Sequence, residues 1–259
     1  MKQPIWHIDA FTSKRFGGNP AAVVLLDGWL PEAVLQAIAA ENNLSETAFI
    51  VPRDAHYDIR WFTPTVEVPL CGHATLASAW VVMNRLDTAL SRVVFHSRSG
   101  ELPVSRDGER LVLDFPAATI APAAQPKPIS TALGGQPEAV FEGFQWLVVY
   151  ASEQEVHALA PDMDALLATG IHGVIATAPG EDCDFVSRFF APVAGIAEDP
   201  VTGSAHTVLA PFWAQRLGRD SLHARQISKR GGELWCELAG ERVLIAGQAQ
   251  SYLEGSIEI

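Results

Sequence analysis

Short apolar runs separated by glycine, proline and asparagine recur along the whole chain, a pattern typical of proteins rich in short strands. Three longer segments have helical length and composition. Pro31 opens the first, which runs to about Glu41, and the others span 74–83 and 206–217, the last closed by Gly218. A shorter helix is expected at 161–168, and strands are expected at 5–11, 21–26, 44–51, 57–63, 93–96, 100–104, 110–115, 144–150, 173–178, 184–190, 234–237 and 243–246. This mixture predicts an α/β (α+β) fold.

The sequence contains this pattern twice. Three echoes occur in the same order at an offset of about 130 residues, and they pair 60–64 with 188–192, 71–74 with 202–205, and 100–113 with 232–245. The first echo reads Arg-Trp-Phe-Thr-Pro and then Arg-Phe-Phe-Ala-Pro, and the second reads Cys-Gly-His-Ala and then Thr-Gly-Ser-Ala. Ordered echoes at a nearly constant offset predict two copies of one α/β unit.

We therefore expect two pseudo-repeated domains, residues 1–117 and 118–259. Four prolines among alanines make 116–128 the predicted interdomain linker. The tail from Gln248 to Ile259 is expected to form a last strand, and whether it returns to the first domain stays open.

The composition excludes several classes of function. The chain has 259 residues, 48% of them hydrophobic and 19% charged, which is ordinary for a globular protein. A net charge of −12 argues against nucleic-acid binding, which needs clustered Lys and Arg. Three cysteines without a CxxC pair suit a reducing cytosol. The chain start has no signal-peptide core and no run of about 20 apolar residues occurs, so we expect a cytoplasmic protein without a membrane span.

The two glycine turns are candidate ligand sites. A helix that begins at such a turn leaves backbone N–H groups unpaired and favours an anionic ligand there. The candidate binding residues are Gly72, His73 and Ala74 in the first copy, and Gly203 and Ser204 in the second. We expect the two turns to face each other across the junction of the halves, where small-molecule pockets commonly form.

Glu46 is the candidate general base. It stands at a predicted helix-to-strand junction, directly before the apolar residues 48–51. The corresponding strand of the second copy, 173–178, has no acid. Because a residue present in one copy only is less expected to belong to the shared scaffold, Glu46 is a candidate for proton transfer. The alternative is an ordinary solvated glutamate at a strand end.

Asp199, Ser204 and Cys71 each have a structural and a chemical interpretation. Asp199 precedes a proline and can brace the turn, and Ser204 can cap the helix or hold a ligand. Cys71 lies at a helix N-terminus, which would lower the pKa of its thiol and make it an additional acid or base, but a small packing residue is the alternative.

Other kinds of site are disfavoured. We expect no metal, because Cys71 and His73 are two residues apart and would not share a helical face, and no established ligand spacing occurs. A serine hydrolase built on Ser204 would need Gly-x-Ser-x-Gly, but residue 202 is threonine. Neither GxGxxG nor GxxxxGK[ST] occurs, which argues against dinucleotide and nucleotide triphosphate binding.

Five motifs together resemble the PhzF family of phenazine-biosynthesis-like isomerases, and they lie at 17–23, 42–47, 60–64, 72–75 and 198–205. The resemblance implies the diaminopimelate-epimerase-like fold, in which two similar domains each have a sheet or barrel wrapped around a central helix. It also implies that Glu46 is the proton shuttle, and that His73, Asp199 and Ser204 complete the polar site, with Asn19 among the substrate-binding residues. The family's type reaction isomerises trans-2,3-dihydro-3-hydroxyanthranilate, a small carboxylate, without a cofactor, and the resemblance also implies a homodimer.

This sequence differs from the family and its relatives at two points. Related epimerases and racemases use two thiols at the two glycine turns, but here only Cys71 matches, and Thr202 stands at the other position. The phenazine enzyme itself has a small residue where this chain has Cys71. Two alternatives therefore stay open: an epimerase or racemase that uses Cys71 with Glu46, and a non-catalytic protein that binds small carboxylates.

Overall fold

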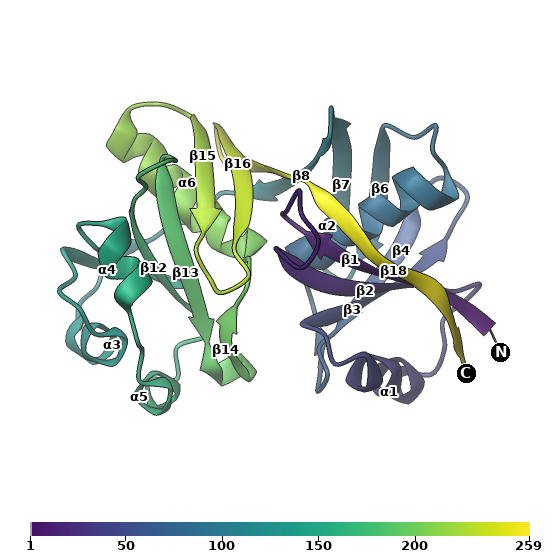
Figure 1. Cartoon of the computed structure of the whole chain (residues 1–259), viewed down its shortest axis with the longest axis horizontal. Coiled ribbons are helices and arrows are strands. Elements are labelled where there is room, and N and C mark those ends of the chain that lie inside the picture. Colours follow the sequence, from purple (N-terminus) through teal and green to yellow (C-terminus); the bar gives the residue numbers. More distant parts are fainter. Residues whose placement is uncertain (1) are drawn as a thin grey trace. The chain divides into compact units, whose positions relative to one another are not determined.

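The structure, a computed structural model, describes residues 2–259 (Figure 1). The chain divides into two units. Residues up to Asp114 together with Ile245–Ile259 form the first, and Phe115–Leu244 form the second. The chain passes from one unit to the other within strands β8 (Arg110–Pro116) and β17 (Arg242–Gly247).

The first unit is built mainly of strands. Its other strands are β1 (Lys2–Ala10), β2 (Asn19–Leu25), β3 (Glu46–Pro52), β4 (Tyr57–Phe62), β5 (Glu67–Val68), β6 (Arg92–Ser97), β7 (Gly100–Asp107) and β18 (Ala249–Glu258). Its helices are α1 (Glu32–Asn42) and α2 (Gly72–Val81), and α2 continues into a π-helical turn, η1 (Val82–Leu86). Strand β18 pairs antiparallel with β1 along its whole length, and Figure 1 shows the two side by side, so the last strand does return to the first unit.

The second unit repeats this plan with more helices. Its strands are β9 (Ala121–Pro122), β10 (Ala139–Glu142), β11 (Trp146–Val149), β12 (Val174–Pro179), β13 (Phe185–Ala191), β14 (Ile196–Asp199), β15 (Ser221–Gln226) and β16 (Gly232–Ala239). Its helices are α3 (Lys127–Leu133), α4 (Glu153–Ala158), α5 (Met163–Ala168), a 3-10 turn η2 (Pro192–Ala194) and α6 (Gly203–Leu217).

Strand pairing confirms the repeat. In the first unit β2 runs parallel to β3, β3 antiparallel to β4, β4 parallel to β6, and β6 antiparallel to β7. In the second unit β11, β12, β13, β15 and β16 show the same order of parallel and antiparallel pairs. The predicted α/β fold with two pseudo-repeated units is therefore confirmed.

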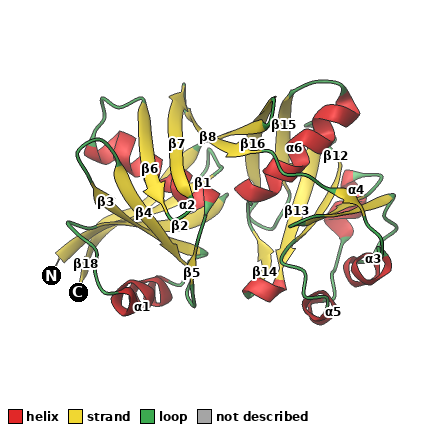
Figure 2. Ribbon diagram, turned by 180° about the vertical axis from the view of Figure 1, so that it is seen from behind, coloured by secondary structure: helices red, strands yellow, loops and turns green. Residues whose placement is uncertain are grey.

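Each unit has one long helix at the centre of its strands. Helix α2 is buried over nearly its whole length and packs against β1, β2, β3 and β18, as expected for a helix that is apolar on all sides. Helix α6 packs against β15 and β16, and its Trp213 stacks on Phe185 of β13 with ring centroids 5.7 Å apart. In Figure 2 both helices lie among the strands of their own unit.

The predicted linker is not a linker. Residues 116–128 belong to the second unit, where they contain β9 and the start of α3. Pro122 lies in a two-residue strand paired with Phe141, and Pro126 and Pro128 lie at the start of α3. Since proline is tolerated at short edge strands and in the first turn of a helix, the proline run marks ordered structure here.

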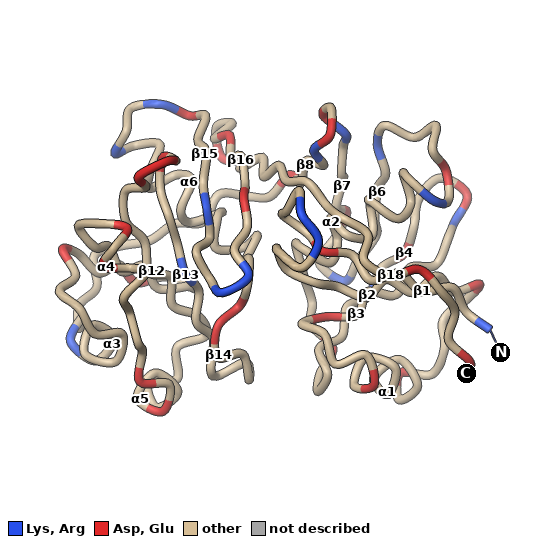
Figure 3. Tube along the Cα trace, viewed as in Figure 1, with Lys and Arg blue, Asp and Glu red and all other residues tan. Residues whose placement is uncertain are grey.

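Charged residues of both signs are interspersed along each unit (Figure 3). Exposed ion pairs such as Arg53–Asp58 and Arg216–Glu138 are typical. Within residues 2–259, no helix combines the length and apolar character that crossing a membrane requires.

Candidate active site

Glu46 begins strand β3 and is 8% exposed. Helix α1 is capped by Asn43, which adopts a left-handed conformation with φ 49° and donates its N–H to the carbonyl of Ala39. Asn42 then hydrogen-bonds the hydroxyl of Thr47 through Nδ2, at 3.1 Å. The two asparagines thus end the helix and lead the chain into the strand, which confirms the predicted junction.

Three buried side chains surround the imidazole of His73, the second residue of α2. Nε2 of His73 lies 3.1 Å from Oε2 of Glu46. On the other side of the ring, Nδ1 lies 3.2 Å from Nδ2 of Asn19 and 3.5 Å from Sγ of Cys71. The structure therefore brings together Glu46, His73, Asn19 and Cys71, the predicted polar residues of the first unit.

The charges of this group follow from burial and proximity. Burial alone would lower the pKa of His73, but the neighbouring Cys71 and Glu46 outweigh it and raise that pKa well above its usual value. Burial raises the pKa of the Cys71 thiol, and Glu46 raises it further. The expectation that the helix N-terminus lowers this pKa was wrong, because desolvation of the thiolate dominates.

Glu46 and His73 approach each other without an aligned hydrogen bond. Although Oε2 of Glu46 and Nε2 of His73 are 3.1 Å apart, both atoms are buried and neither has a hydrogen-bond partner among the described residues. Such atoms are costly to bury unsatisfied, so a ligand that bonds to either is stabilised there. The pair can accept a proton, hold it and release it.

Glu46, Cys71 and His73 also offer three metal-ligand types within 4.8 Å of one another. The expectation that Cys71 and His73 lie apart was wrong. Cys71 precedes the helix with an extended backbone (φ −145°, ψ 112°), which lets its sulfur lie beside the ring of His73. However, Cys71 and Glu46 lie beside different ring nitrogens, and a histidine ligates a given ion through one of them. The thiol and the carboxylate thus contact opposite sides of the imidazole.

The start of α2 supplies backbone donors. The first bond of the helix runs from the Thr75 N–H to the Cys71 carbonyl, at 3.1 Å. The N–H groups of Gly72 and His73 precede it and have no acceptor within the helix, an arrangement that favours an anion. The third candidate, Ala74, is a buried residue of the same first turn.

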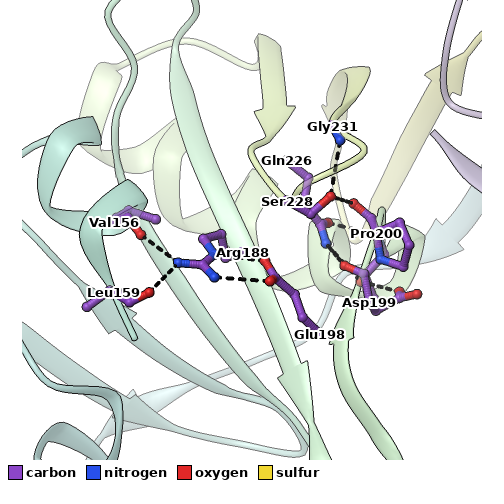
Figure 4. A network of polar contacts seen from close by, with 10 residues as sticks. Val156, Leu159, Arg188, Glu198, Asp199, Pro200, Gln226, Ser228 and Gly231 are labelled. Atoms are coloured by element: carbon purple, nitrogen blue, oxygen red, sulfur yellow. Dashed lines mark hydrogen bonds and ion pairs between the residues drawn. The ribbon is translucent and has the colours of Figure 1, made fainter. Parts of the chain in front are cut away.

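Asp199 ends strand β14 and braces the second glycine turn. Its Oδ2 accepts a hydrogen bond from the hydroxyl of Thr202, at 2.5 Å. Gln226 donates through Nε2 to the Asp199 carbonyl at 2.7 Å, and its Oε1 accepts from the Thr202 N–H at 2.8 Å. Figure 4 shows Gln226 reaching Asp199, with Ser228 bonded to Pro200 beside them. The bracing role predicted for Asp199 is thus present in the structure.

Ser204, the second residue of α6, is exposed, and its hydroxyl accepts a hydrogen bond from Nε2 of Gln145 at 3.0 Å. Sequence reasoning missed Gln145 and Gln226, because a single glutamine forms no local pattern. Only the tertiary structure brings these residues to the turn.

His206, the other histidine after a glycine turn, has a structural role. Its Nδ1 lies 2.8 Å from the Thr202 carbonyl, and burial lowers its pKa to about 4. A neutral ring at neutral pH donates Nδ1–H to that carbonyl.

The two helix starts correspond to each other. Cys71 is the N-cap of α2 and Thr202 is the N-cap of α6, both with extended backbones. Threonine therefore occupies the position in the second unit that the thiol occupies in the first.

Comparison with known proteins extends this picture. The model of the phenazine biosynthesis-like protein family matches residues 8–255. An uncharacterized isomerase of Pseudomonas aeruginosa is 52% identical over 259 residues, with all of both chains covered. A human phenazine biosynthesis-like domain-containing protein is 43% identical over 286 residues, with 99% of each chain covered.

Solved structures resemble the chain over its full length. The crystal structure of a PhzF-family protein from Enterococcus faecalis matches with a TM-score of 0.97 at 45% identity, covering 100% of both chains. A hydroxyproline epimerase from Agrobacterium vitis matches with a TM-score of 0.63 at 12% identity, covering 99% of this chain and 92% of that one. The second likeness concerns the fold alone.

Proposed function

The chain belongs to the PhzF family of phenazine biosynthesis-like proteins and is an isomerase, and from this premise we propose that it moves a proton within a small carboxylate substrate. The observation that carries the proposal is the buried approach of Oε2 of Glu46 to Nε2 of His73 at 3.1 Å, with neither atom hydrogen-bonded among the described residues. The family's type reaction, isomerisation of trans-2,3-dihydro-3-hydroxyanthranilate, is the proposed reaction.

Glu46 is the proposed general acid/base. Its carboxylate takes a proton from a carbon of the substrate and returns it to another carbon on the same face. The Nε2–H of His73 donates a hydrogen bond to the electron-rich part of the substrate as charge develops, while Nδ2 of Asn19 and Sγ of Cys71 lie beside Nδ1 and hold the ring in place. Positioned acid–base groups of this kind contribute about 10²- to 10⁴-fold in rate. The proposed reaction needs no cofactor, because a carboxylate and an imidazole supply the proton transfer.

The proposal assigns substrate binding to the helix starts. The N–H groups of Gly72 and His73 and of Gly203 and Ser204 are suited to a carboxylate, since a helix N-terminus carries partial positive charge. Asp199 is proposed to relay or hold a proton on a polar group of the substrate. Its bond from Thr202 fixes the orientation of its carboxylate.

A second candidate function is epimerisation or racemisation of a small carboxylate by Cys71 with Glu46. The proximity of the Cys71 sulfur to His73 favours it. The raised pKa of the Cys71 thiol and the presence of Thr202 at the other N-cap argue against a two-thiol mechanism. A non-catalytic carboxylate-binding protein is the alternative of another class.

Exchange of substrate protons with D2O, followed by NMR, tests the proposal. The wild type, Glu46→Gln and the control Glu41→Gln, at an exposed position of α1, are each given trans-2,3-dihydro-3-hydroxyanthranilate, diaminopimelate and proline. We expect deuterium uptake with isomerisation of the first compound only, lost in Glu46→Gln and kept in Glu41→Gln.

Other outcomes contradict the proposal in distinct ways. Full turnover by Glu46→Gln would exclude the mechanism. Uptake only at the α-carbon of an amino acid would favour the epimerase, and binding of these compounds without any exchange would favour the binding protein. A homodimer is the proposed assembly, and the molar mass from light scattering tests it separately.

A further inference from the structure

Gln145 is a buried side chain directed at the start of helix α6. It directly precedes strand β11 and is 6% exposed. Its Nε2 donates to the hydroxyl of Ser204 at 3.0 Å, while its Oε1 is buried without a hydrogen-bond partner among residues 2–259. Because a carboxamide is planar and short, fixing Nε2 on Ser204 also fixes Oε1 close to this helix start.

The hydrogen bond from Gln145 leaves the hydroxyl proton of Ser204 available to a ligand. A hydroxyl oxygen that accepts from Nε2 still has its own proton to donate. Ser204 is exposed, and the N–H groups of Gly203 and Ser204 begin a helix of 15 residues. The hydroxyl and the two amides together form a donor set suited to a carboxylate.

Oε1 of Gln145 is an acceptor and requires a hydrogen-bond donor. A buried acceptor without a donor is unfavourable, so a ligand N–H or O–H that reaches it is bound more tightly than a ligand without one. Gln226 of the same unit provides a contrast, because its Oε1 accepts from Thr202 and its Nε2 donates to the Asp199 carbonyl. Gln226 is therefore satisfied by the protein itself, whereas Gln145 is not.

The first unit contains a related contact. Nδ2 of Asn19 lies 3.2 Å from Nδ1 of His73, the second residue of α2, and Nε2 of Gln145 donates to Ser204, the second residue of α6. A buried carboxamide thus orients the same helix position in both units.

We propose that Gln145 is a ligand-binding residue that orients the Ser204 hydroxyl toward a carboxylate and receives a hydrogen bond from an amino or hydroxyl group next to that carboxylate. The proposal rests on the proposed function only in taking a small carboxylate as the ligand. It adds a specificity-determining residue, which selects carboxylates that carry a neighbouring donor.

A binding cycle with two probe ligands tests the proposal. Benzoate and 2-aminobenzoate differ by the neighbouring donor, and calorimetry gives the Kd of each for the wild type, Gln145→Met and the matched control Gln154→Met, at an exposed position of α4. We expect the wild type and the control to prefer 2-aminobenzoate by about tenfold, and Gln145→Met to bind both probes with similar Kd values. Gln145→Glu, which keeps the shape and adds a negative charge, should weaken both probes.

An unchanged preference in Gln145→Met would overturn the proposal, as would a failure of the folded wild type to bind either probe. Circular dichroism confirms that each variant is folded. The cycle is repeated with Glu46→Gln, because binding requires no proton transfer. If Glu46 is not the acid/base, the preference for 2-aminobenzoate should still depend on Gln145. If that preference does not depend on Gln145, the effect of Glu46→Gln on deuterium exchange is unaffected.

Discussion

Gly173, the residue directly before β12, corresponds to Glu46, the first residue of β3. Thr47 of β3 pairs with Phe62, and Val174 of β12 pairs with Phe190, the equivalent residue of the repeated Arg-x-Phe motif. Glu46 directly precedes Thr47, and Gly173 directly precedes Val174. The sequence repeat therefore carries a carboxylate in one copy and no side chain in the other.

The second unit has no room for a side chain at this position. A Cβ on Gly173 would lie 2.4 Å from Cζ of Phe189. We expect Gly173→Ala to lower the free energy of unfolding by about 1–3 kcal/mol, because the phenyl ring must shift in a packed interior. Urea denaturation measures the difference.

Two controls sharpen this prediction. Gly28→Ala should be nearly neutral, since a Cβ there meets nothing within 4 Å. Phe189→Leu should relieve the overlap, so Gly173→Ala should cost less in that background. An equal cost in both backgrounds would show that the ring of Phe189 is not what excludes a side chain.

The sequence allowed the repeat, the fold class and the position of Glu46 to be predicted, because each depends on a local pattern. It failed where the tertiary structure decides. Helical geometry predicted that the side chains of Cys71 and His73 would not share a face. Cys71 lies outside the helix with an extended backbone, so that prediction does not apply to it. Gln145, directly before β11, and Gln226, at the end of β15, reach the second glycine turn from other parts of the sequence, and nothing local to either glutamine indicates this.

The structure also shows the role of the two repeated arginines, Arg60 and Arg188, which the sequence did not indicate. Arg60 of β4 forms a two-pronged ion pair with Glu67 of β5, and Arg188 of β13 forms the same pair with Glu198 of β14. Each arginine ties together the two strands that lead to a glycine turn. The motif that helped to indicate the family is therefore part of the scaffold.

Replacing Arg188 by lysine should destabilise the protein. Arg188 binds Glu198 through Nε and Nη2, and its Nη1 donates to the carbonyls of Val156 and Leu159 at 3.2 and 2.8 Å (Figure 4). An ammonium group cannot reproduce this planar fork, so we expect Arg188→Lys to cost about 2 kcal/mol in urea denaturation. Arg216→Lys, in an ion pair with Glu138 in which both side chains are 46% exposed, should change stability by less than about 0.5 kcal/mol. Equal effects would refute a structural role for the fork.

Cys71 should contribute little to turnover. Its thiol is buried and its pKa is raised, so the thiolate needed for a thiol mechanism is scarce at neutral pH. We expect Cys71→Ala to reduce isomerisation by less than about tenfold, and Glu46→Gln to reduce it by about 10²-fold or more. Steady-state kinetics on trans-2,3-dihydro-3-hydroxyanthranilate gives both numbers. Loss of activity in Cys71→Ala as severe as in Glu46→Gln would instead support the epimerase mechanism.

His206 should make the protein less stable in mild acid. Its pKa is lowered from 6.5 to about 4 in the folded protein, because the ring is fully buried. Between these values the unfolded chain binds the proton more readily than the folded chain, so stability falls as the pH falls from about 6.5 toward 4. The linkage relation gives a loss from this group of about 2 kcal/mol at pH 5 relative to pH 7.5.

The variant that isolates this effect is His206→Asn. Its amide can still donate to the Thr202 carbonyl, which now accepts from Nδ1 of His206, but it does not titrate. Urea denaturation at pH 7.5 and pH 5 should therefore show a smaller drop for His206→Asn than for the wild type, by about 2 kcal/mol. His157→Asn, at an exposed position of α4, should keep the wild-type drop. If His206→Asn kept it as well, the acid sensitivity would have to come from other groups, and His206 would be protonated in the core at little cost.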